Sequence, residues 1–159
     1  MLTSMVVFRV DRNIISYNTA ISACGTVGNW SLALVLLTEM EGDILLPDVI
    51  SYNAAINACA GSWFVMLFLL ECMDSMDIRR DVITYNTAIG VCAEDGLWSL
   101  AVSLLKQIDS EELLPDIVSF CSAIAACAQD GQWEIALGLS LDMKRQVIPA
   151  NTISYSGLI

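Results

Sequence analysis

The chain carries a helical pattern of apolar residues that it repeats along its length. Tyr17, Ile21 and Cys24 stand at i, i+4 and i+7, the spacing of the buried stripe of an amphipathic helix. Two glycines interrupt that pattern, and a second stripe of the same kind runs from Trp30 to Met40. No segment alternates apolar and polar residues with the period of a strand. We therefore predict a hairpin of two helices as the unit of an all-α fold.

This helical hairpin recurs at an almost constant period. Its tryptophan stands at residues 30, 63, 98 and 133, so the steps are 33, 35 and 35 residues. A fixed period in this range is typical of an α-solenoid, in which each unit covers the apolar face of the next. We expect Trp30, Trp98 and Trp133 to be well buried between helices, and an exposed indole would argue against the repeat assignment. The predicted units are residues 1–13 (the tail of a preceding repeat), 14–48, 49–81 (two residues short), 82–116, 117–151 and 152–159 (the start of a truncated repeat).

The composition favours a packed core and shows no sign of catalysis. Hydrophobic residues make up 56% of the chain and charged residues only 16%, which excludes a disordered chain. The sequence has no histidine, the commonest general base and metal ligand. It also has no metal-ligand spacing and no phosphate-binding loop, and its carboxylate pairs stand at predicted turns and helix ends. We predict a protein that is not an enzyme and that uses no cofactor and no metal.

Four cysteines occupy the same place in successive units. Equivalent sites in stacked helices lie roughly 9–10 Å apart, whereas a disulfide needs Cα atoms within about 7 Å. We therefore predict small buried thiols rather than disulfides, and a reducing compartment. These cysteines are Cys24, Cys59, Cys92 and Cys127.

One segment is apolar enough to raise the question of a membrane span. Residues 49–70 contain no charged side chain, and about 20 apolar residues suffice to cross a bilayer. However, the segment contains Asn53, Asn57 and a Gly-Ser break, and it matches the helix pairs of the other units. We predict a buried helix pair and no membrane partner.

The units share a motif at each end and at the turn. Three of them open with ISYN or ITYN, all four have Gly-x-Trp between their helices, and two end in Pro-Asp. This arrangement resembles the pentatricopeptide repeat family over nearly the whole chain. The tetratricopeptide repeat, which has a similar length, places its tryptophan early in the first helix. Here the tryptophan opens the second helix, so the resemblance is to the pentatricopeptide repeat.

The resemblance implies a right-handed superhelix whose first helices line a groove for single-stranded RNA. In that family one nucleotide is read per repeat, by the fifth and the last residue of the unit. An Asn followed by an Asp favours uracil, so the resemblance implies a U-rich preference for the first three units. The implied base-reading residues are Asn18 with Asp48, Asn53 with Asp81, Asn86 with Asp116, Cys121 with Asn151, and Ser156; the residues implied to sandwich the bases are Ile15, Ile50, Ile83, Val118 and Ile153. The base for Cys121 and Asn151 is unassigned.

Helix geometry independently supports a reading surface. Ile15, Asn18 and Ser22 fall at i, i+3 and i+7, on a face offset from the buried stripe. An amide on that face has both donors and an acceptor for a base edge.

The family further implies a role in RNA processing, stability or expression in an organelle, the mitochondrion or the plastid. Residues 1–13 lack the Arg- and Ser-rich character of a transit peptide.

A second interpretation is a helical scaffold for protein–protein interactions without RNA binding. The net charge is −11, and the aspartates at the unit ends would be good helix N-caps in any helical array. Lysines that the family often carries two residues after the cysteine are replaced by Thr26, Glu94 and Gln129. The segment from Phe64 to Leu70 is apolar on nearly every side. We expect weak RNA binding by this chain alone, and self-association through its exposed ends.

Overall fold

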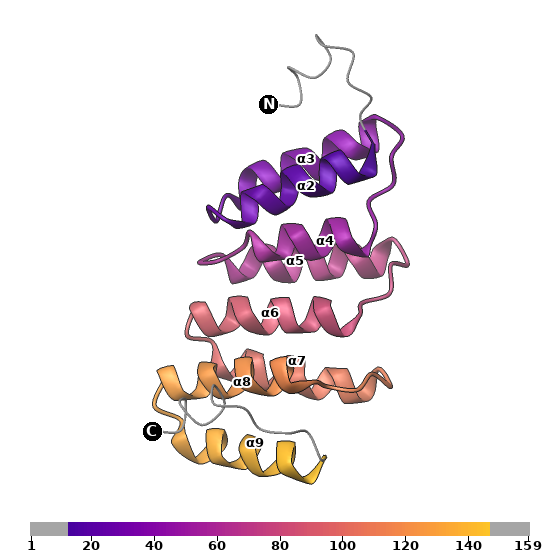
Figure 1. Cartoon of the computed structure of the whole chain (residues 1–159). Coiled ribbons are helices and arrows are strands. Elements are labelled where there is room, and N and C mark those ends of the chain that lie inside the picture. Colours follow the sequence, from indigo (N-terminus) through magenta and orange to yellow (C-terminus); the bar gives the residue numbers. More distant parts are fainter. Residues whose placement is uncertain (1–12, 147–159) are drawn as a thin grey trace.

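The structure, a computed structural model, describes residues 13–146 and consists there of four antiparallel helix pairs stacked in one direction (Figure 1). No strand occurs within this range. The fold is the α-solenoid of helix-turn-helix repeats that the sequence predicts. Its helices are α2 (Ile14–Gly25), α3 (Trp30–Gly42), α4 (Val49–Asn57), α5 (Trp63–Ser75), α6 (Val82–Glu94), α7 (Trp98–Ser110), α8 (Ile117–Gln129) and α9 (Trp133–Arg145).

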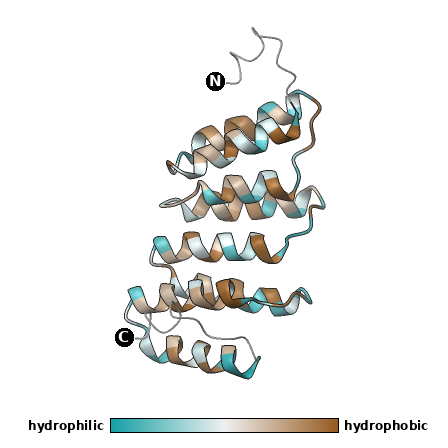
Figure 2. Ribbon diagram, viewed as in Figure 1, coloured by the Kyte–Doolittle hydropathy of each residue, from teal (hydrophilic) through white to brown (hydrophobic). Residues whose placement is uncertain are grey.

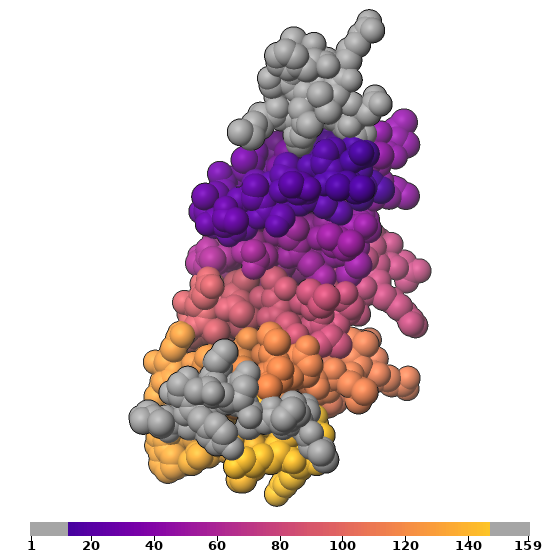
Figure 3. Space-filling view, viewed as in Figure 1, coloured from indigo at the N-terminus to yellow at the C-terminus, as the bar shows by residue number. Residues whose placement is uncertain are grey.

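The first helices of the pairs form the inner layer of the solenoid. α2 packs on α4, α4 on α6 and α6 on α8, whereas the backbones of consecutive second helices hardly approach one another. Helices on the inside of a curved stack must lie closer together than those on the outside. The array therefore curves toward α2, α4, α6 and α8, and Figure 3 shows the units as successive bands along its length.

The hydrophobic stripes of both helices in each pair meet in one continuous core. Tyr17, Tyr85 and Phe120 are buried at the same place in their units, and hydrophobic residues recur along every helix (Figure 2). The four repeated cysteines are buried and free, as predicted. Burial, with a smaller effect of the Asp95 carboxylate, raises the pKa of Cys59 and of Cys92 to about 12. No helix in the described range is long and apolar enough to cross a membrane.

The prediction that three indoles are well buried is wrong for Trp133, whose surface is 64% exposed. Trp30 and Trp98 are only partly buried. The next unit covers part of Trp30, because Phe64 packs edge-on against it, with ring centroids 6.3 Å apart. No second helix follows α9 within residues 13–146, so Trp133 lacks such a cover. The pair of α8 and α9 forms nevertheless, so an exposed indole does not overturn the repeat assignment.

Three second helices, α3, α5 and α7, are each followed by a left-handed residue two positions after their last residue. Ile44, Asp77 and Glu112 have φ values of 61°, 56° and 58°. The next N–H then bonds back into the helix, as from Leu45 to the Met40 carbonyl at 2.9 Å, which is a Schellman cap. A left-handed conformation is costly for a β-branched residue, and Ile44 is 90% exposed. Its side chain therefore adds strain and little packing.

Replacing Ile44 with Gly should stabilise the protein by about 1 kcal/mol, because Gly adopts positive φ without the Cβ clash. The change would be measured as a higher urea midpoint at unchanged slope. Leu46→Gly is the matched control, because Leu46 is 78% exposed in the same loop and has no positive φ. That control should lower stability. Equal effects of the two substitutions would contradict the assignment of strain to residue 44.

The short second unit loses the last turn of its first helix. α4 has 9 residues where α6 and α8 have 13. Ser62 makes no side-chain hydrogen bond at the start of α5. Instead Asp95, which follows α6, accepts the N–H of Gly61 at 2.8 Å and that of Trp63 at 3.0 Å. A carboxylate of the third unit therefore caps a helix of the second, and the deletion is accommodated within a regular stack.

We expect Asp95→Ala to lower the free energy of unfolding by about 1–2 kcal/mol, since it leaves two backbone donors at the start of α5 without their acceptor. Asp130 provides the control, because it stands at the same place after α8 and accepts only a 3.5 Å contact from Gln132. Chemical denaturation of both variants would check the difference. A loss for Asp130→Ala as large as that for Asp95→Ala would rule out the capping role.

Candidate functional site

The predicted reading aspartates all begin first helices. Asp48, Asp81 and Asp116 are the N-caps of α4, α6 and α8, and each forms a capping box with the third residue of its helix. In each box the carboxylate accepts the backbone N–H of that third residue, at 2.7–2.9 Å. The capping role that any helical array would give these residues is therefore present.

The same carboxylates also contact the predicted reading asparagines. The amide nitrogen of Asn18 lies 3.3 Å from Asp48 Oδ1, that of Asn53 3.3 Å from Asp81 Oδ1, and that of Asn86 3.0 Å from Asp116 Oδ1. Each asparagine comes from the preceding first helix, about 30 residues earlier in the chain. The structure thus brings together all three Asn/Asp pairs whose residues it describes.

Hydrogen bonding keeps these aspartates ionised. Burial alone would raise the pKa of each carboxyl, but the donors from the capping box and from the asparagine outweigh it, so the pKa of Asp48, Asp81 and Asp116 lies below its ordinary value. Since the folded-state pKa is depressed, the carboxylates stabilise the fold above the ordinary aspartate pKa. That contribution is lost as pH falls through the folded-state pKa.

Exposed apolar side chains stand beside the pairs on the inner layer. Ile15, Ile50, Ile83 and Val118 are each between 50% and 75% exposed. Ile83 and Val118 border a groove of about 450 Å³ between α6 and α8 that also contains Asn86 and Asp116. Apolar side chains flanking a polar pair can contact the faces of a planar ring while the pair contacts its edge. This groove is the most complete candidate site.

The fourth predicted pair is described only in part. Cys121 lies half-buried on α8, at the place that the asparagines occupy in earlier units. Asn151, Ile153 and Ser156 lie outside the described residues.

Serine hydroxyls join the site in a way that sequence reasoning missed. Ser51 Oγ lies 2.6 Å from Asn18 Oδ1, and Ser119 Oγ lies 2.5 Å from Asn86 Oδ1. Each serine is fully buried, and it also forms the capping box of its own helix. The S/T at the third position of every unit was the available signal, because it recurs with the asparagine and the aspartate.

The inner layer carries no basic side chain in the part of the chain that the structure describes. The basic residues Arg79, Arg80, Lys106, Lys144 and Arg145 lie in α7, in α9 and in the loop before α6, and Arg9 and Arg12 lie outside the described residues. Glu94 borders the groove beside Asn86. Phosphate neutralisation supplies most non-specific affinity for nucleic acids, so we expect the groove to attract a phosphate backbone weakly.

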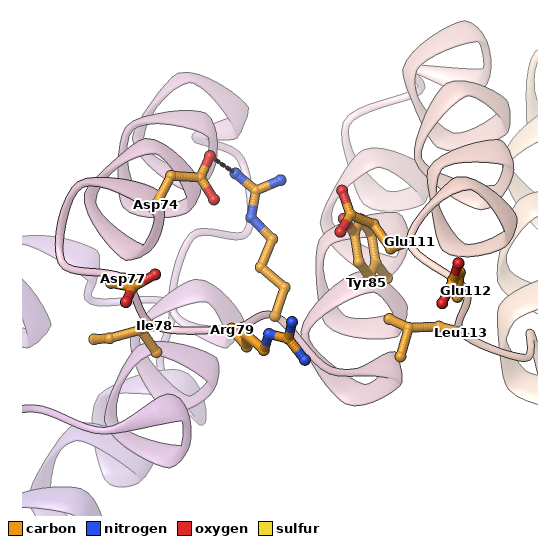
Figure 4. Close-up of a pocket in the computed structure, with 9 residues that line it drawn as sticks. Asp74, Asp77, Ile78, Arg79, Tyr85, Glu111, Glu112 and Leu113 are labelled. Atoms are coloured by element: carbon orange, nitrogen blue, oxygen red, sulfur yellow. Dashed lines mark hydrogen bonds and ion pairs between the residues drawn. The ribbon is translucent and has the colours of Figure 1, made fainter.

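A second hollow lies between the loops at the ends of the second helices (Figure 4). It measures about 360 Å³, and carboxylates surround it together with Arg79 and Arg80. Arg80 pairs with Asp74 and donates to the Leu70 carbonyl at 3.0 Å, so this arginine stabilises the loop. Within residues 13–146 no group of acidic or cysteine side chains has the arrangement of a metal site.

Comparison with known proteins gives one consistent family. Family models match in three places: the PPR repeat family over residues 12–61, the pentatricopeptide repeat domain over residues 68–129 and the PPR repeat over residues 118–146. A pentatricopeptide repeat-containing protein of Arabidopsis thaliana is 48% identical over 46 residues, which are 29% of this chain and 8% of that protein.

Solved structures share the fold. The pentatricopeptide repeat protein PPR10, from maize, in complex with an 18-nt psaJ RNA element superposes with a TM-score of 0.85 at 22% identity, over 93% of this chain and 22% of PPR10. The PPR domain of the Arabidopsis thaliana protein-only RNase P 1 in complex with tRNA gives a TM-score of 0.76 at 14% identity, over 91% of this chain and 78% of that domain. The chain therefore spans about a fifth of the length of PPR10.

Proposed function

Because the chain belongs to the pentatricopeptide repeat family, we propose that it binds single-stranded RNA along its inner layer, one nucleotide per helix pair. The base-reading residues are Asn18 with Asp48, Asn53 with Asp81, and Asn86 with Asp116, and the exposed residues at the second position of each unit sandwich the bases. Binding without catalysis is the activity proposed for this part of the chain.

The observation that carries the proposal is the repeated geometry of the pairs. Three asparagines contact three N-cap carboxylates at 3.0–3.3 Å, beside exposed apolar side chains on the same layer. Each amide nitrogen has a second N–H for a ligand, and uracil presents the carbonyl acceptors to receive it. A preference for three consecutive uracils follows.

The proposed cellular role follows from the relatives. PPR10 is described in complex with an RNA element and the RNase P domain in complex with tRNA. We propose that the protein acts in RNA processing, stability or expression in the mitochondrion or the plastid, as members of this family do.

The proposal is tested by equilibrium binding of the chain to short single-stranded RNAs at about 50 mM salt, where phosphate contacts contribute most. An RNA with three uracils in an otherwise adenine sequence should bind more tightly than the all-adenine strand. Duplex RNA should bind less well, because its bases are not available for stacking and edge contacts. Equal affinity for all these RNAs would overturn base reading.

A protein-scaffold function has one specific observation in its favour. Phe64 and Phe68 on the outer helix α5 are each more than half exposed, whereas α7 carries Ser99 and Ser103 at the equivalent places. Glu71 and Asp74 follow on the same helix, both exposed. This combination suits a partner helix that has an apolar face and basic residues.

A synthetic amphipathic helix of leucine and lysine is the probe for that second function. Its binding should be lost in the double variant Phe64→Ser with Phe68→Ser, which copies the serines of α7, while RNA binding is retained. Unchanged peptide binding in this variant would exclude α5 as a docking surface.

A further inference from the structure

The three Asn/Asp pairs meet at junctions that differ in one side chain. A junction consists of an asparagine, the N-cap aspartate of the next unit and the third residue of that unit. The junctions are Asn18, Asp48 and Ser51; Asn53, Asp81 and Thr84; and Asn86, Asp116 and Ser119. In the first and third the serine hydroxyl lies 2.6 and 2.5 Å from the asparagine oxygen. In the second no such bond forms, and Asn53 Oδ1 is buried without a hydrogen-bond partner.

The threonine of the second junction keeps the helix cap intact. Thr84 Oγ1 lies 2.8 Å from Asp81 Oδ1, and the Thr84 N–H lies 2.7 Å from the same oxygen. The capping box is therefore the same with Thr as with Ser. What differs is the methyl group, because a β-branched residue has restricted χ1 rotamers. The Thr84 hydroxyl contacts the Asp81 carboxylate and forms no hydrogen bond with the amide oxygen of Asn53.

The extra bond decides how firmly the asparagine is oriented. Asn86 is held at both ends of its amide, since its nitrogen donates to Asp116 and its oxygen accepts from Ser119. Only its second N–H is left for a ligand. Asn53 is held by a single 3.3 Å contact to Asp81. The present orientation of the Asn53 amide is therefore weakly held, since it has one long hydrogen bond and a buried oxygen without a partner, which is itself unfavourable.

Orientation of the amide matters for one pair of bases in particular. Uracil has a carbonyl acceptor, O4, at the place where cytosine has an N4 amino donor. A fixed N–H donor can form a hydrogen bond with O4 of uracil but not with the N4 amino group of cytosine. An amide that can turn its oxygen outward serves both bases about equally well.

We propose that the third residue of each unit is a positioning residue that sets how strictly the preceding asparagine discriminates uracil from cytosine. Ser51 and Ser119 make the first and third units strict, and Thr84 makes the second unit tolerant. This inference rests on the proposed reading of RNA by the Asn/Asp pairs. It adds a specificity determinant that lies in the neighbouring unit and contacts no base itself.

Two reciprocal exchanges test the proposal in the full chain: Thr84→Ser and Ser119→Thr. Binding is measured at low salt to an RNA with three consecutive uracils and to the three RNAs in which one uracil is cytosine. In the parent chain, cytosine should weaken binding about three- to tenfold at the first and third nucleotides, the factor expected for one hydrogen bond, and by about twofold or less at the second. Thr84→Ser should raise the uracil-to-cytosine affinity ratio at the second nucleotide to about three- to tenfold. Ser119→Thr should lower that ratio at the third nucleotide to about twofold or less.

Each exchange should alter the ratio at one nucleotide only. Thr84→Ser retains the cap but removes a buried methyl group, so its thermal unfolding should begin at a slightly lower temperature. A merely structural effect of that kind would weaken binding to all four RNAs alike and would change no ratio. If Ser119→Thr fails to fold, Thr84→Ser alone still decides. Uracil discrimination that is equal at all three nucleotides and unmoved by Thr84→Ser would overturn the inference and leave the proposed function standing. No uracil preference at any nucleotide would overturn the proposed function itself.

Discussion

Three lysines on the inner layer should convert this chain from a weak into a strong binder of single-stranded RNA. The substitutions are Thr26→Lys, Glu94→Lys and Gln129→Lys, at or next to the C-terminal ends of α2, α6 and α8. Cations are favourable at helix C-termini, and Glu94 borders the groove that contains Asn86. The described part of the inner layer has no basic residue. The new lysines would therefore be its first positive charges able to contact phosphate.

The expected gain is large because it is electrostatic. Three neutralised phosphates on a single strand give a slope of about −2 in log affinity against log salt, and a gain of about tenfold or more at 50 mM salt. Fluorescence anisotropy with a U-rich RNA over a range of salt concentrations measures both quantities. The parent chain should show a shallow slope.

A control set separates position from net charge. Thr38→Lys, Glu71→Lys and Gln107→Lys change the same residue types by the same total charge, at exposed places on the second helices α3, α5 and α7. These lysines should raise affinity much less. Equal gains from the two sets would mean that RNA does not follow the inner layer.

Asn86→Ser should change the base preferred at one nucleotide from uracil to guanine. The family favours guanine where serine is paired with aspartate, and Asp116 remains in place as the N-cap of α8. A polar base contact contributes about 1–3 kcal/mol of discrimination, which corresponds to a change of about five- to 150-fold in relative affinity. Competition binding between RNAs that differ at a single nucleotide measures the change.

Asn57→Ser is the matched control for this substitution. Asn57 borders the same groove but stands outside the Asn/Asp pairs, so its loss should leave the base preference unchanged. If Asn86→Ser weakens binding to all RNAs by the same factor, the Asn86 side chain contributes to affinity without reading the base.

The periodic features of this fold could be predicted from the sequence because they are local. The stripe through Tyr17, Ile21 and Cys24 follows from the period of a helix, and the helix starts at Asp48, Asp81 and Asp116 follow from N-cap chemistry. The position of each asparagine beside the next aspartate then depends only on the repeat length. The three pairs that lie within residues 13–146 accordingly meet in space.

Features that depend on a neighbouring unit were not predictable in this way. Asp95 caps α5 across a unit boundary because the second unit is two residues short, and no spacing rule links the two places. Burial of Trp30 depends on whether the next unit supplies Phe64, and Trp133 has no such cover among the described helices. The oxygen of Asn53 is unpaired at the junction where the following helix has Thr84 in place of a serine.

The double duty of the N-cap aspartates limits which reading residues this architecture can adopt. A side chain at the end of a unit must present an acceptor to the first turn of the next helix, and Ala at such a place costs about 1 kcal/mol. Asp, Asn, Ser and Thr meet that demand, and residues 48, 81, 116 and 151 are all drawn from this group. Helix capping therefore restricts this base-reading position to a few residue types, whether or not a base is bound. Redesigning target choice is then freer at the asparagine than at its partner.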